Sequence, residues 1–532
     1  MDKDRIKDFI GRIPFSAELY WFVHQGGQPP HSHFKLKSLQ AALPQACTEV
    51  KPFAETAARG RKVFIFATLH YWIEHTAMMG LALAGNGHQV TLGYLPYGEW
   101  HKPINRFDLR RQNAYARQVL QESAPWLRTV SLLEVNPVRR TLPDELRTAV
   151  EQVSQFDTQY TLQVEEVDRN NPLFKLRMER NEAAALSALT WLKNHRPDVV
   201  IIPNGIIQEL GMVYHVARYL NIPTVTYEFG DQNERIWLAQ DAQIMRQETD
   251  GLWQARQAIP LGESQIERVR AMYAARQNAA VWENFSRLWQ GVPAQGGEQV
   301  RAALGLDNRP VALLATNVLG DSLTLGRQVF SQTMAEWITR TVQFFAIHPG
   351  IQLVIRVHPG EALTSGASMV DVVRQALAEL PEHIHLIGPE EKVNTYDLVE
   401  VADMGLVYTT TVGMEMAMSG VPVVIAGKTH YRGRGFSSDP SSWEAYFDQL
   451  HHLFENPTAH RLTQDQVNLA WQYAYRFFFE FPRPFPWHLL RLWNDYKLRP
   501  MRFVLGEEGR ARYAETFRYL VGEPLDWAKI DM

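Results

Sequence analysis

Short apolar runs rich in β-branched residues alternate with segments of helical period from Lys62 onward. This alternation is typical of βαβ units, in which parallel strands are joined by crossover helices. The expected strands of a first series are 63–67, 89–95, 129–133, 199–202 and 224–227, and those of a second series are 311–315, 352–357, 385–387, 405–408 and 421–425. We therefore predict the α/β fold class, with two doubly wound, Rossmann-like sheets.

The residues between and around the two series indicate the domain limits. Pro293–Gly297 consists mostly of small, turn-forming residues between two helical stretches, which predicts a linker. We expect a helical N-terminal extension over 1–60, a first α/β domain over 61–292 with a helical insertion at 137–180, a second α/β domain over 298–470, and a segment over 471–532 that packs back on the first domain. The length of 532 residues agrees with this division at roughly 100–200 residues per domain.

The C-terminal segment allows two interpretations. Residues 477–487 read FFFEFPRPFPW, and the three prolines exclude a regular helix. Because large aromatic side chains dominate buried contacts, packing against the first domain is the favoured interpretation. Aromatic and arginine side chains also suit the headgroup region of a membrane, so a peripheral membrane contact through 477–487 stays open.

Charge balance and cysteine content exclude some classes of protein. The 54 Lys and Arg against 58 Asp and Glu give a formal charge of −4 without a basic run, so nucleic acid is not an expected partner. A single cysteine, Cys47, cannot form an intramolecular disulfide, which fits a reducing compartment. The charged start MDKDRIKD is not followed by an apolar run, and no stretch suits a lipid-exposed helix. We expect a cytoplasmic protein, peripheral at the inner membrane face if 477–487 contacts lipid.

Several well-known catalytic motifs are absent from the sequence. It contains no Gly-x-Gly-x-x-Gly after the first strand, no Gly-x-x-x-x-Gly-Lys-Ser/Thr and no Gly-x-Ser-x-Gly. Their absence argues against a dinucleotide oxidoreductase, a P-loop NTPase and an α/β-hydrolase. No His and Cys residues have zinc-site spacing, so we predict neither a metal site nor a bound cofactor.

Polar loops follow the strands of the second series. The loop after 405–408 contains Thr410, Thr411 and Gly413 and leads into a helix, an arrangement suited to a phosphate. Glu415, one turn into that helix, is a candidate acceptor for a ribose diol. The competing interpretation is that Thr410 or Thr411 only caps the helix and that Glu415 complements its dipole.

Three further loops are expected at the same sheet edge, because the carboxyl ends of parallel strands lie together. Their candidate residues are Arg356 and His358 after the second strand, Asn317, Asp321 and Arg327 after the first, and His430 and Tyr431 within the cationic, glycine-rich loop 427–436 after the last. Arg356 alone could be an ion-pair partner and His358 alone a structural histidine. The convergence of four polar loops favours a binding site.

The first series has its own polar loops after the strands. Glu74 and His75 follow the first strand, Asn204 the fourth, and Glu228 and Asp231 the fifth. An acceptor alcohol needs a base within hydrogen-bond reach, and Glu74, His75, Glu228 and Asp231 are the titratable candidates. Glu74 could instead cap the helix that follows, and Glu228 could pair with Arg235.

These motifs together resemble a known family. The stretches concerned are 317–321, 356–359, 407–417 and 427–436 in the second domain, and 227–231 and 245–253 in the region before it. In these stretches the chain resembles bacterial capsule and surface-polysaccharide biosynthesis proteins. Those proteins are similar to GT-B glycosyltransferases, including the Kdo-transferring capsule synthases. The likeness covers most of residues 60–490.

The resemblance implies a GT-B fold, in which two Rossmann-like domains face each other across a cleft. It implies a nucleotide-sugar held mainly by the second domain, as co-substrate, and a glycan or lipid-linked saccharide acceptor held mainly by the first. The implied donor-binding residues are Asn317, Asp321, Arg327, Arg356, Thr410, Thr411, Gly413, Glu415, His430 and Tyr431. The implied acceptor-binding residues are His75, Asn204 and Glu228, and the catalytic candidates are Glu74, Asp231 and His358.

The expected activity is a metal-independent glycosyl transfer to a capsule-like or O-antigen-like polysaccharide. The loop Glu228-Phe229-Gly230-Asp231 departs from the Kdo-transferring members, so neither CMP-Kdo nor a covalent carboxylate intermediate follows from the resemblance. Two alternatives share the fold: a non-hydrolysing nucleotide-sugar epimerase, and a non-catalytic polysaccharide assembly or export protein. The sequence leaves open the sugar, the acceptor, the stereochemistry, the base and the oligomeric state.

Overall fold

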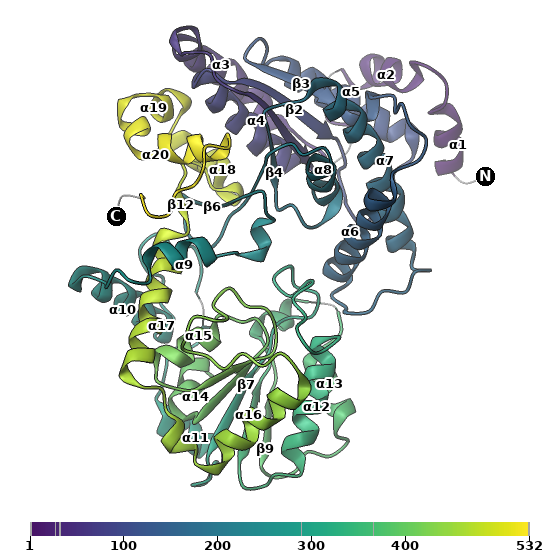
Figure 1. Cartoon of the computed structure of the whole chain (residues 1–532). Coiled ribbons are helices and arrows are strands. Elements are labelled where there is room, and N and C mark those ends of the chain that lie inside the picture. The colour runs from purple at the N-terminus through teal and green to yellow at the C-terminus, as the bar shows by residue number, and fades with distance from the viewer. Residues whose placement is uncertain (1–2, 27, 31–32, 289, 365, 530–532) are drawn as a thin grey trace. The chain divides into compact units, whose positions relative to one another are not determined.

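A computed structural model describes residues 3–26, 28–30, 33–288, 290–364 and 366–529 (Figure 1). The chain divides into two compact units, each of which contains segments that are distant in sequence. Unit 1 consists of Met1–Asp157, Asp168–Met245 and Pro482–Leu525, and unit 2 of Thr158–Val167, Arg246–Phe481 and Asp526–Met532.

Unit 1 contains a seven-stranded sheet in the order β12-β6-β5-β4-β1-β2-β3. Its strands are β1 (Lys62–Thr68), β2 (Gln89–Leu95), β3 (Leu127–Ser131), β4 (Val199–Pro203), β5 (Thr224–Glu228), β6 (Arg235–Gln240) and β12 (Arg483–Pro484). Strands β1 to β5 are parallel, whereas β6 and β12 are antiparallel to their neighbours. The central strands are continuous apolar runs because both faces of a parallel sheet are covered.

Helices cover this sheet and form the rest of unit 1. They are α1 (Lys3–Ile10), α2 (Ser16–Tyr20), a π-helix (Trp21–Gln25), α3 (Lys37–Thr56), α4 (His70–Gly85), α5 (Arg106–Gln121), α7 (Pro172–His195), α8 (Gln208–Tyr219), α18 (Leu492–Leu498), α19 (Met501–Leu505) and α20 (Glu507–Leu520), with α6 (Asp144–Leu162) ending in unit 2. Helix α4 is buried almost throughout, since it packs on β1 and β2 and is also contacted by α3 and α19.

Unit 2 contains a five-stranded, fully parallel sheet in the order β11-β10-β7-β8-β9. Its strands are β7 (Val311–Ala315), β8 (Gln352–Arg356), β9 (Ile384–Ile387), β10 (Met404–Val407) and β11 (Val423–Ile425). Its helices are α9 (Asp250–Arg256), α10 (Glu263–Gln277), α11 (Gly297–Leu304), α12 (Met334–Ala346), α13 (Met369–Ala376), α14 (Thr395–Val401), α15 (Val412–Met418), α16 (Trp443–Glu455) and α17 (Gln464–Tyr475). The strand order in both units is doubly wound, so the prediction of an α/β fold with two Rossmann-like sheets is confirmed.

The expected domain limits differ from the units in three places. Residues 246–292, expected in the first domain, lie in unit 2, because α10 supplies buried contacts there: Arg276 pairs with Glu415, and the Tyr273 hydroxyl lies 3.0 Å from Ser419 Oγ. Residues 158–167 also belong to unit 2, where the Glu165 carboxylate accepts hydrogen bonds from the first amides of α12. The predicted insertion at 137–180 is helical, but α7 continues to His195.

The aromatic C-terminal segment is divided between the two units after Phe481. From Pro482 it lies in unit 1, where β12 adds to β6. The burial of this stretch favours packing within the protein over the lipid contact through 477–487, because its aromatic side chains are buried except for Phe479, which is half-buried. Among the described residues no helix is long and apolar enough to cross a membrane.

Candidate functional site

Four loops meet at the carboxyl edge of the unit 2 sheet, as the sequence predicts. The His358 amide after β8 donates a hydrogen bond to Thr316 Oγ1 after β7 at 3.0 Å. The Thr409 amide after β10 donates to Asn317 Oδ1 at 3.1 Å. The loops after β7, β8 and β10 are therefore tied together.

The fourth loop, after β11, is joined to the same group by two hydrogen bonds between Arg327 and Lys428. Arg327 Nη1 donates to the Lys428 carbonyl at 2.6 Å, and the Lys428 amide donates to the Arg327 carbonyl at 2.8 Å. Through these two hydrogen bonds, Arg327 positions the backbone of Lys428. The Lys428 side chain is exposed, and its ammonium makes no hydrogen bond or ion pair with any described residue.

His358 has a defined tautomer in this loop. Its Nδ1 accepts a hydrogen bond from the Gly360 amide at 3.0 Å, so the neutral ring carries its hydrogen on Nε2. Glycine is needed at 360 for this approach, since a Cβ there would lie 2.8 Å from Nδ1. His358 is exposed and therefore offers an N–H donor at the sheet edge.

Some buried polar atoms at this edge have no hydrogen-bond partner among the described residues. They are Thr409 Oγ1 and Thr429 Oγ1. Buried polar atoms are normally paired, so this edge has more hydrogen-bonding capacity than the described protein uses. Thr411, half-buried at the start of α15, adds a hydroxyl that makes no capping hydrogen bond.

Four of the predicted donor-binding residues hold the loops in place. Arg356 donates to the carbonyls of Gly388, Glu391 and Val393 and so fixes the loop after β9. The Tyr431 hydroxyl donates to the Thr410 carbonyl at 2.6 Å, and the Asp321 carboxylate accepts from the Leu323 amide at 3.0 Å. Gly413 makes room for Tyr431, because a Cβ at 413 would overlap Tyr431 Oη.

Two predicted donor-binding residues lie in the interior of unit 2 and need correction. Glu415 is 2% exposed and forms an ion pair with Arg276, so its carboxylate, expected to hold a ribose, already has a partner within unit 2. The His430 ring is stacked on Phe477 with centroids 3.8 Å apart, and its Nδ1 lies 2.9 Å from the Tyr473 hydroxyl. Burial lowers the pKa of His430 well below its ordinary value, so the ring is neutral.

In unit 1, Glu228 and Asn204 lie side by side at the carboxyl edge of the sheet. Asn204 Nδ2 donates to Glu228 Oε2 at 3.1 Å, and Asn204 Oδ1 accepts from the Ile206 amide at 3.1 Å. Asn204 has a φ of 59°, a left-handed conformation that asparagine tolerates better than most residues. Glu228 is half-buried, and burial raises its pKa to about 7, although hydrogen bonds from Phe229 and Asn204 oppose the shift.

The other candidates of unit 1 are less suited to act on a substrate. Glu74 is buried between α3 and α18, where it accepts from Trp493 Nε1 at 2.9 Å; burial raises its pKa to about 7. His75 is fully buried, 3.1 Å from the Trp487 carbonyl, and its pKa falls to about 3. Asp231 is half-buried in the loop after β5. No pattern in the sequence indicates that Trp493, 419 residues away, holds Glu74.

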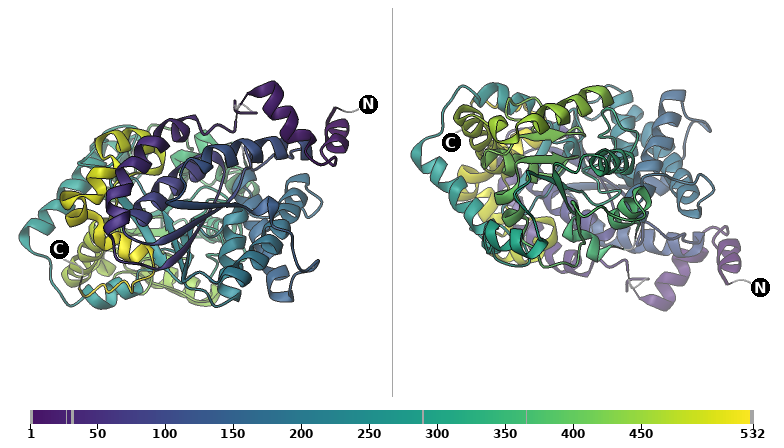
Figure 2. Two further views of the ribbon diagram at one scale, coloured as in Figure 1. Left: turned by 90° about the horizontal axis from the view of Figure 1, so that it is seen from above. Right: turned by 90° about the horizontal axis from the view of Figure 1, so that it is seen from below.

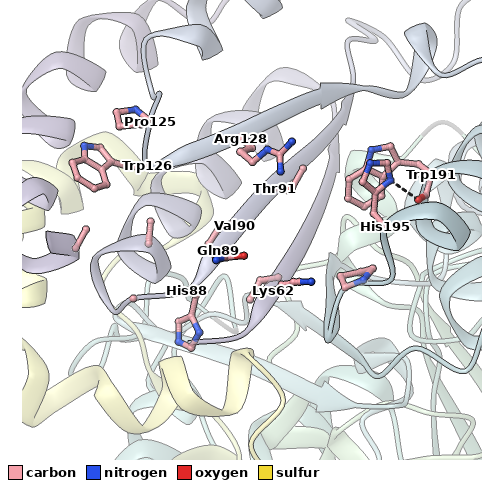
Figure 3. Close-up of a pocket in the computed structure, with 15 residues that line it drawn as sticks. Lys62, His88, Gln89, Val90, Thr91, Pro125, Trp126, Arg128, Trp191 and His195 are labelled. Atoms are coloured by element: carbon pink, nitrogen blue, oxygen red, sulfur yellow. Dashed lines mark hydrogen bonds between the residues drawn. The ribbon is translucent and has the colours of Figure 1, made fainter. Parts of the chain in front are cut away.

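A cavity of about 570 Å³ lies elsewhere in unit 1 (Figure 3). It is lined by Lys62 and Gln89, the first residues of β1 and β2, together with Arg128, Trp191 and other residues. It is therefore at the amino-terminal edge of the sheet, and none of the predicted site residues lines it. Figure 3 shows His195 beside Trp191, with the ring centroids 4.2 Å apart. Among the described residues no group of three or more His, Cys, Asp or Glu side chains is arranged to hold a metal ion.

Comparison with known proteins gives structural matches only. No protein-family model and no curated protein matches the sequence. The chain is similar to KpsC, a β-Kdo 2,4 transferase of Thermosulfurimonas dismutans, at 18% identity over 52% of this chain and 79% of that one, with a TM-score of 0.34. It is also similar to the UDP-GlcNAc 2-epimerase of Neisseria meningitidis bound to UDP-GlcNAc, at 14% identity over 79% of this chain and 99% of that one, with a TM-score of 0.25.

A third match is the glycotransferase of kitacinnamycin, at 14% identity over 87% of this chain and all (100%) of that one, with a TM-score of 0.24.

Proposed function

We propose that this protein is a metal-independent glycosyltransferase that moves a sugar from a nucleotide-sugar to a hydroxyl of a surface polysaccharide or lipid-linked saccharide. One observation carries the proposal: the loops after β7, β8, β10 and β11 are hydrogen-bonded into one group that offers donors at the sheet edge. Ligands of doubly wound sheets bind at this edge.

The donor site proposed on unit 2 is built from His358, Lys428 and Thr411. In this proposal the Nε2–H of His358 and the ammonium of Lys428 donate to phosphate oxygens, and the Thr411 hydroxyl adds a third donor. As the bond between the sugar and the phosphate breaks, negative charge grows on the leaving nucleotide. Fixed donors that meet this charge stabilise the transition state.

The base proposed on unit 1 is Glu228, in place of the Glu74 and Asp231 favoured by the sequence. The acceptor oxygen attacks the anomeric carbon, the nucleotide leaves with the electron pair of its bond to the sugar, and the Glu228 carboxylate takes the hydroxyl proton. A pKa of about 7 suits this task, since a base works best when its pKa lies near the operating pH. Asn204 holds the carboxylate in place through its 3.1 Å hydrogen bond.

Nucleotide release from UDP-, GDP-, CMP- and dTDP-sugars, with and without acceptor saccharides, tests the activity. We expect acceptor-dependent release from one nucleotide class. Glu228→Gln should lower kcat by about 100-fold or more while leaving donor affinity unchanged. In the wild type, kcat/KM should rise with pH up to about 7 as Glu228 ionises, and this rise should be lost in the variant.

The donor site has its own variants and control. His358→Ala and Lys428→Ala should each raise the donor KM by about tenfold. Arg374→Ala, which removes an exposed cation from α13 of the same unit, is the matched control and should have no effect. Epimerisation of the donor without any acceptor would identify an epimerase instead. Binding of a nucleotide-sugar without turnover would identify a non-catalytic protein, and either result would contradict the proposal.

A further inference from the structure

The segment 3–25 of unit 1 carries an unusual number of exposed apolar side chains. Phe9, Phe15 and Phe22 are 68%, 77% and 71% exposed. The other large apolar side chains exposed in this segment are Ile10, Ile13, Leu19, Tyr20 and Val23. Helices α1 and α2, purple in Figure 2, lie at the outside of unit 1. Exposed apolar groups clustered in this way mark a binding surface.

This segment is nevertheless attached firmly to the rest of unit 1. Arg110 of α5 donates to the carbonyls of Gly11 and Ile13, both at 2.8 Å. Ala17 and Trp21 are buried, and the Trp21 ring lies 6.4 Å from that of Tyr115. The exposed side chains therefore project from a folded base.

Lys7 pairs with Asp108 of α5 at 2.8 Å, but the other charged side chains of the segment differ in their partners. Its acidic groups face α5: Asn105 Nδ2 donates to Asp4 at 3.0 Å, the Arg106 amide donates to Asp8 at 2.7 Å, and Arg110 Nε donates to Glu18 at 2.9 Å. By contrast, three cations are exposed and make no hydrogen bond or ion pair with any described residue. These cations are Lys3, Arg5 and Arg12.

Phe15, an exposed apolar residue of the segment, has a strained backbone conformation. Its φ of 62° lies in the left-handed region, which favours glycine and is strained for a bulky side chain. The chain adopts this conformation immediately before α2, with the phenyl ring 77% exposed. Burial of the ring in a partner would remove its apolar surface from water and so stabilise this conformation of Phe15.

We propose that the segment 3–25 docks unit 1 on a lipid surface that contains anionic headgroups. Aromatic and aliphatic side chains together with unpaired cations are the composition of a segment that lies in the interface, with the apolar groups below the headgroups and the cations among them. Helices of eight and five residues lie on a bilayer without spanning it, since a span needs about 20 residues. This inference is independent of the proposed catalytic activity.

Flotation of the full-length protein with vesicles tests the proposal. The vesicles are phosphatidylcholine alone and phosphatidylcholine mixed with phosphatidylglycerol. We expect binding to the mixed vesicles that weakens at high salt, because the cationic part of the attraction is screened. The double variant Phe15→Ser/Phe22→Ser should bind the mixed vesicles with an affinity lower by about tenfold or more, because two apolar rings are lost from the interface. Arg5→Glu/Arg12→Glu should lose the preference for phosphatidylglycerol.

The control removes equally exposed apolar groups elsewhere. Ile347 and Leu363 of unit 2 are 76% and 92% exposed, and Ile347→Ser/Leu363→Ser should bind vesicles like the wild type. Circular dichroism and thermal melting confirm that each variant is folded. Absence of vesicle binding by the wild type would overturn the proposal, as would equal binding by Phe15→Ser/Phe22→Ser. Self-association that is lost in this variant, without vesicle binding, would identify a second copy as the occupant and would also overturn it.

Discussion

The substitution Glu228→Gln should make the protein more stable at neutral and higher pH, although it removes a candidate catalytic group. Burial raises the pKa of Glu228 from 4.5 to about 7. A carboxyl group with a raised pKa stabilises the fold fully below its unfolded pKa, and this contribution is lost as the pH rises through the folded pKa. The shift is 7 − 4.5, or about 2.5, so at about 1.4 kcal/mol per pKa unit the loss is at most about 3–4 kcal/mol.

Glutamine keeps the shape of the side chain and can still accept the hydrogen bond from Asn204, but it has no charge to bury. Urea unfolding at about pH 4.5 and at about pH 8, followed by unit 1 tryptophan fluorescence, measures the difference. We expect Glu228→Gln to have a higher free energy of unfolding than the wild type at the higher pH. The difference between variant and wild type should be up to about 3 kcal/mol larger at the higher pH than at the lower.

Glu182→Gln, a change to an exposed carboxylate on α7, is the matched control. If the two variants gain the same stability between the two pH values, the gain does not come from the burial of Glu228. A role of Glu228 burial would also be refuted if the free energies of unfolding of Glu228→Gln and the wild type differed by the same amount at both pH values. The uncharged side chain would then offer no advantage over the ionised one.

Two further predictions concern stability. Gly413→Ala should destabilise unit 2 by about 1–3 kcal/mol, since the new Cβ overlaps Tyr431 Oη, and the double variant with Tyr431→Phe should lose less than the sum of the single variants in urea unfolding; strict additivity would count against the overlap. Arg177→Met should lower the free energy of unfolding by about 3–5 kcal/mol, because Arg177 is the buried partner of both Asp157 and Glu209. A melting temperature close to that of the wild type would show that these carboxylates are not left unpaired.

The strands could be predicted because burial on both faces leaves a simple signal. Strands β4 and β7 are buried along their whole length and appear in the sequence as continuous apolar runs. Strand β6 was missed, since it is antiparallel to β5 and its burial alternates, with polar residues at both ends. The doubly wound order then followed from the alternation of strands and helices.

The position of the loops that carry the candidate residues could be predicted, but the direction of their side chains could not. A residue that follows a parallel strand must lie at the carboxyl edge, which correctly placed His358 and Lys428 there. Whether a side chain points to the edge or to the interior depends on partners that are distant in sequence. Glu415 is buried against Arg276, 139 residues away, and no local spacing predicts this pair.

The boundary between the units was also beyond the sequence pattern. Pro293–Gly297 has the composition of a linker, yet the chain passes to unit 2 after Met245. The sequence of helix α10 carries no sign of the unit to which it belongs, and only its contacts assign it to unit 2. The exposed apolar groups of 3–25 were overlooked for a similar reason, because short helices give too few turns to show which face is buried.

The central claim is that the carboxyl edge of the unit 2 sheet binds the phosphates of a nucleotide-sugar. A crystal structure of the protein with the nucleotide that the turnover assay selects tests this claim most directly. The account predicts a phosphate within hydrogen-bond distance of His358 Nε2 and Lys428 Nζ, beside Thr411. A nucleotide bound elsewhere, for instance in the cavity lined by Lys62 and Arg128, with this edge empty, would contradict it.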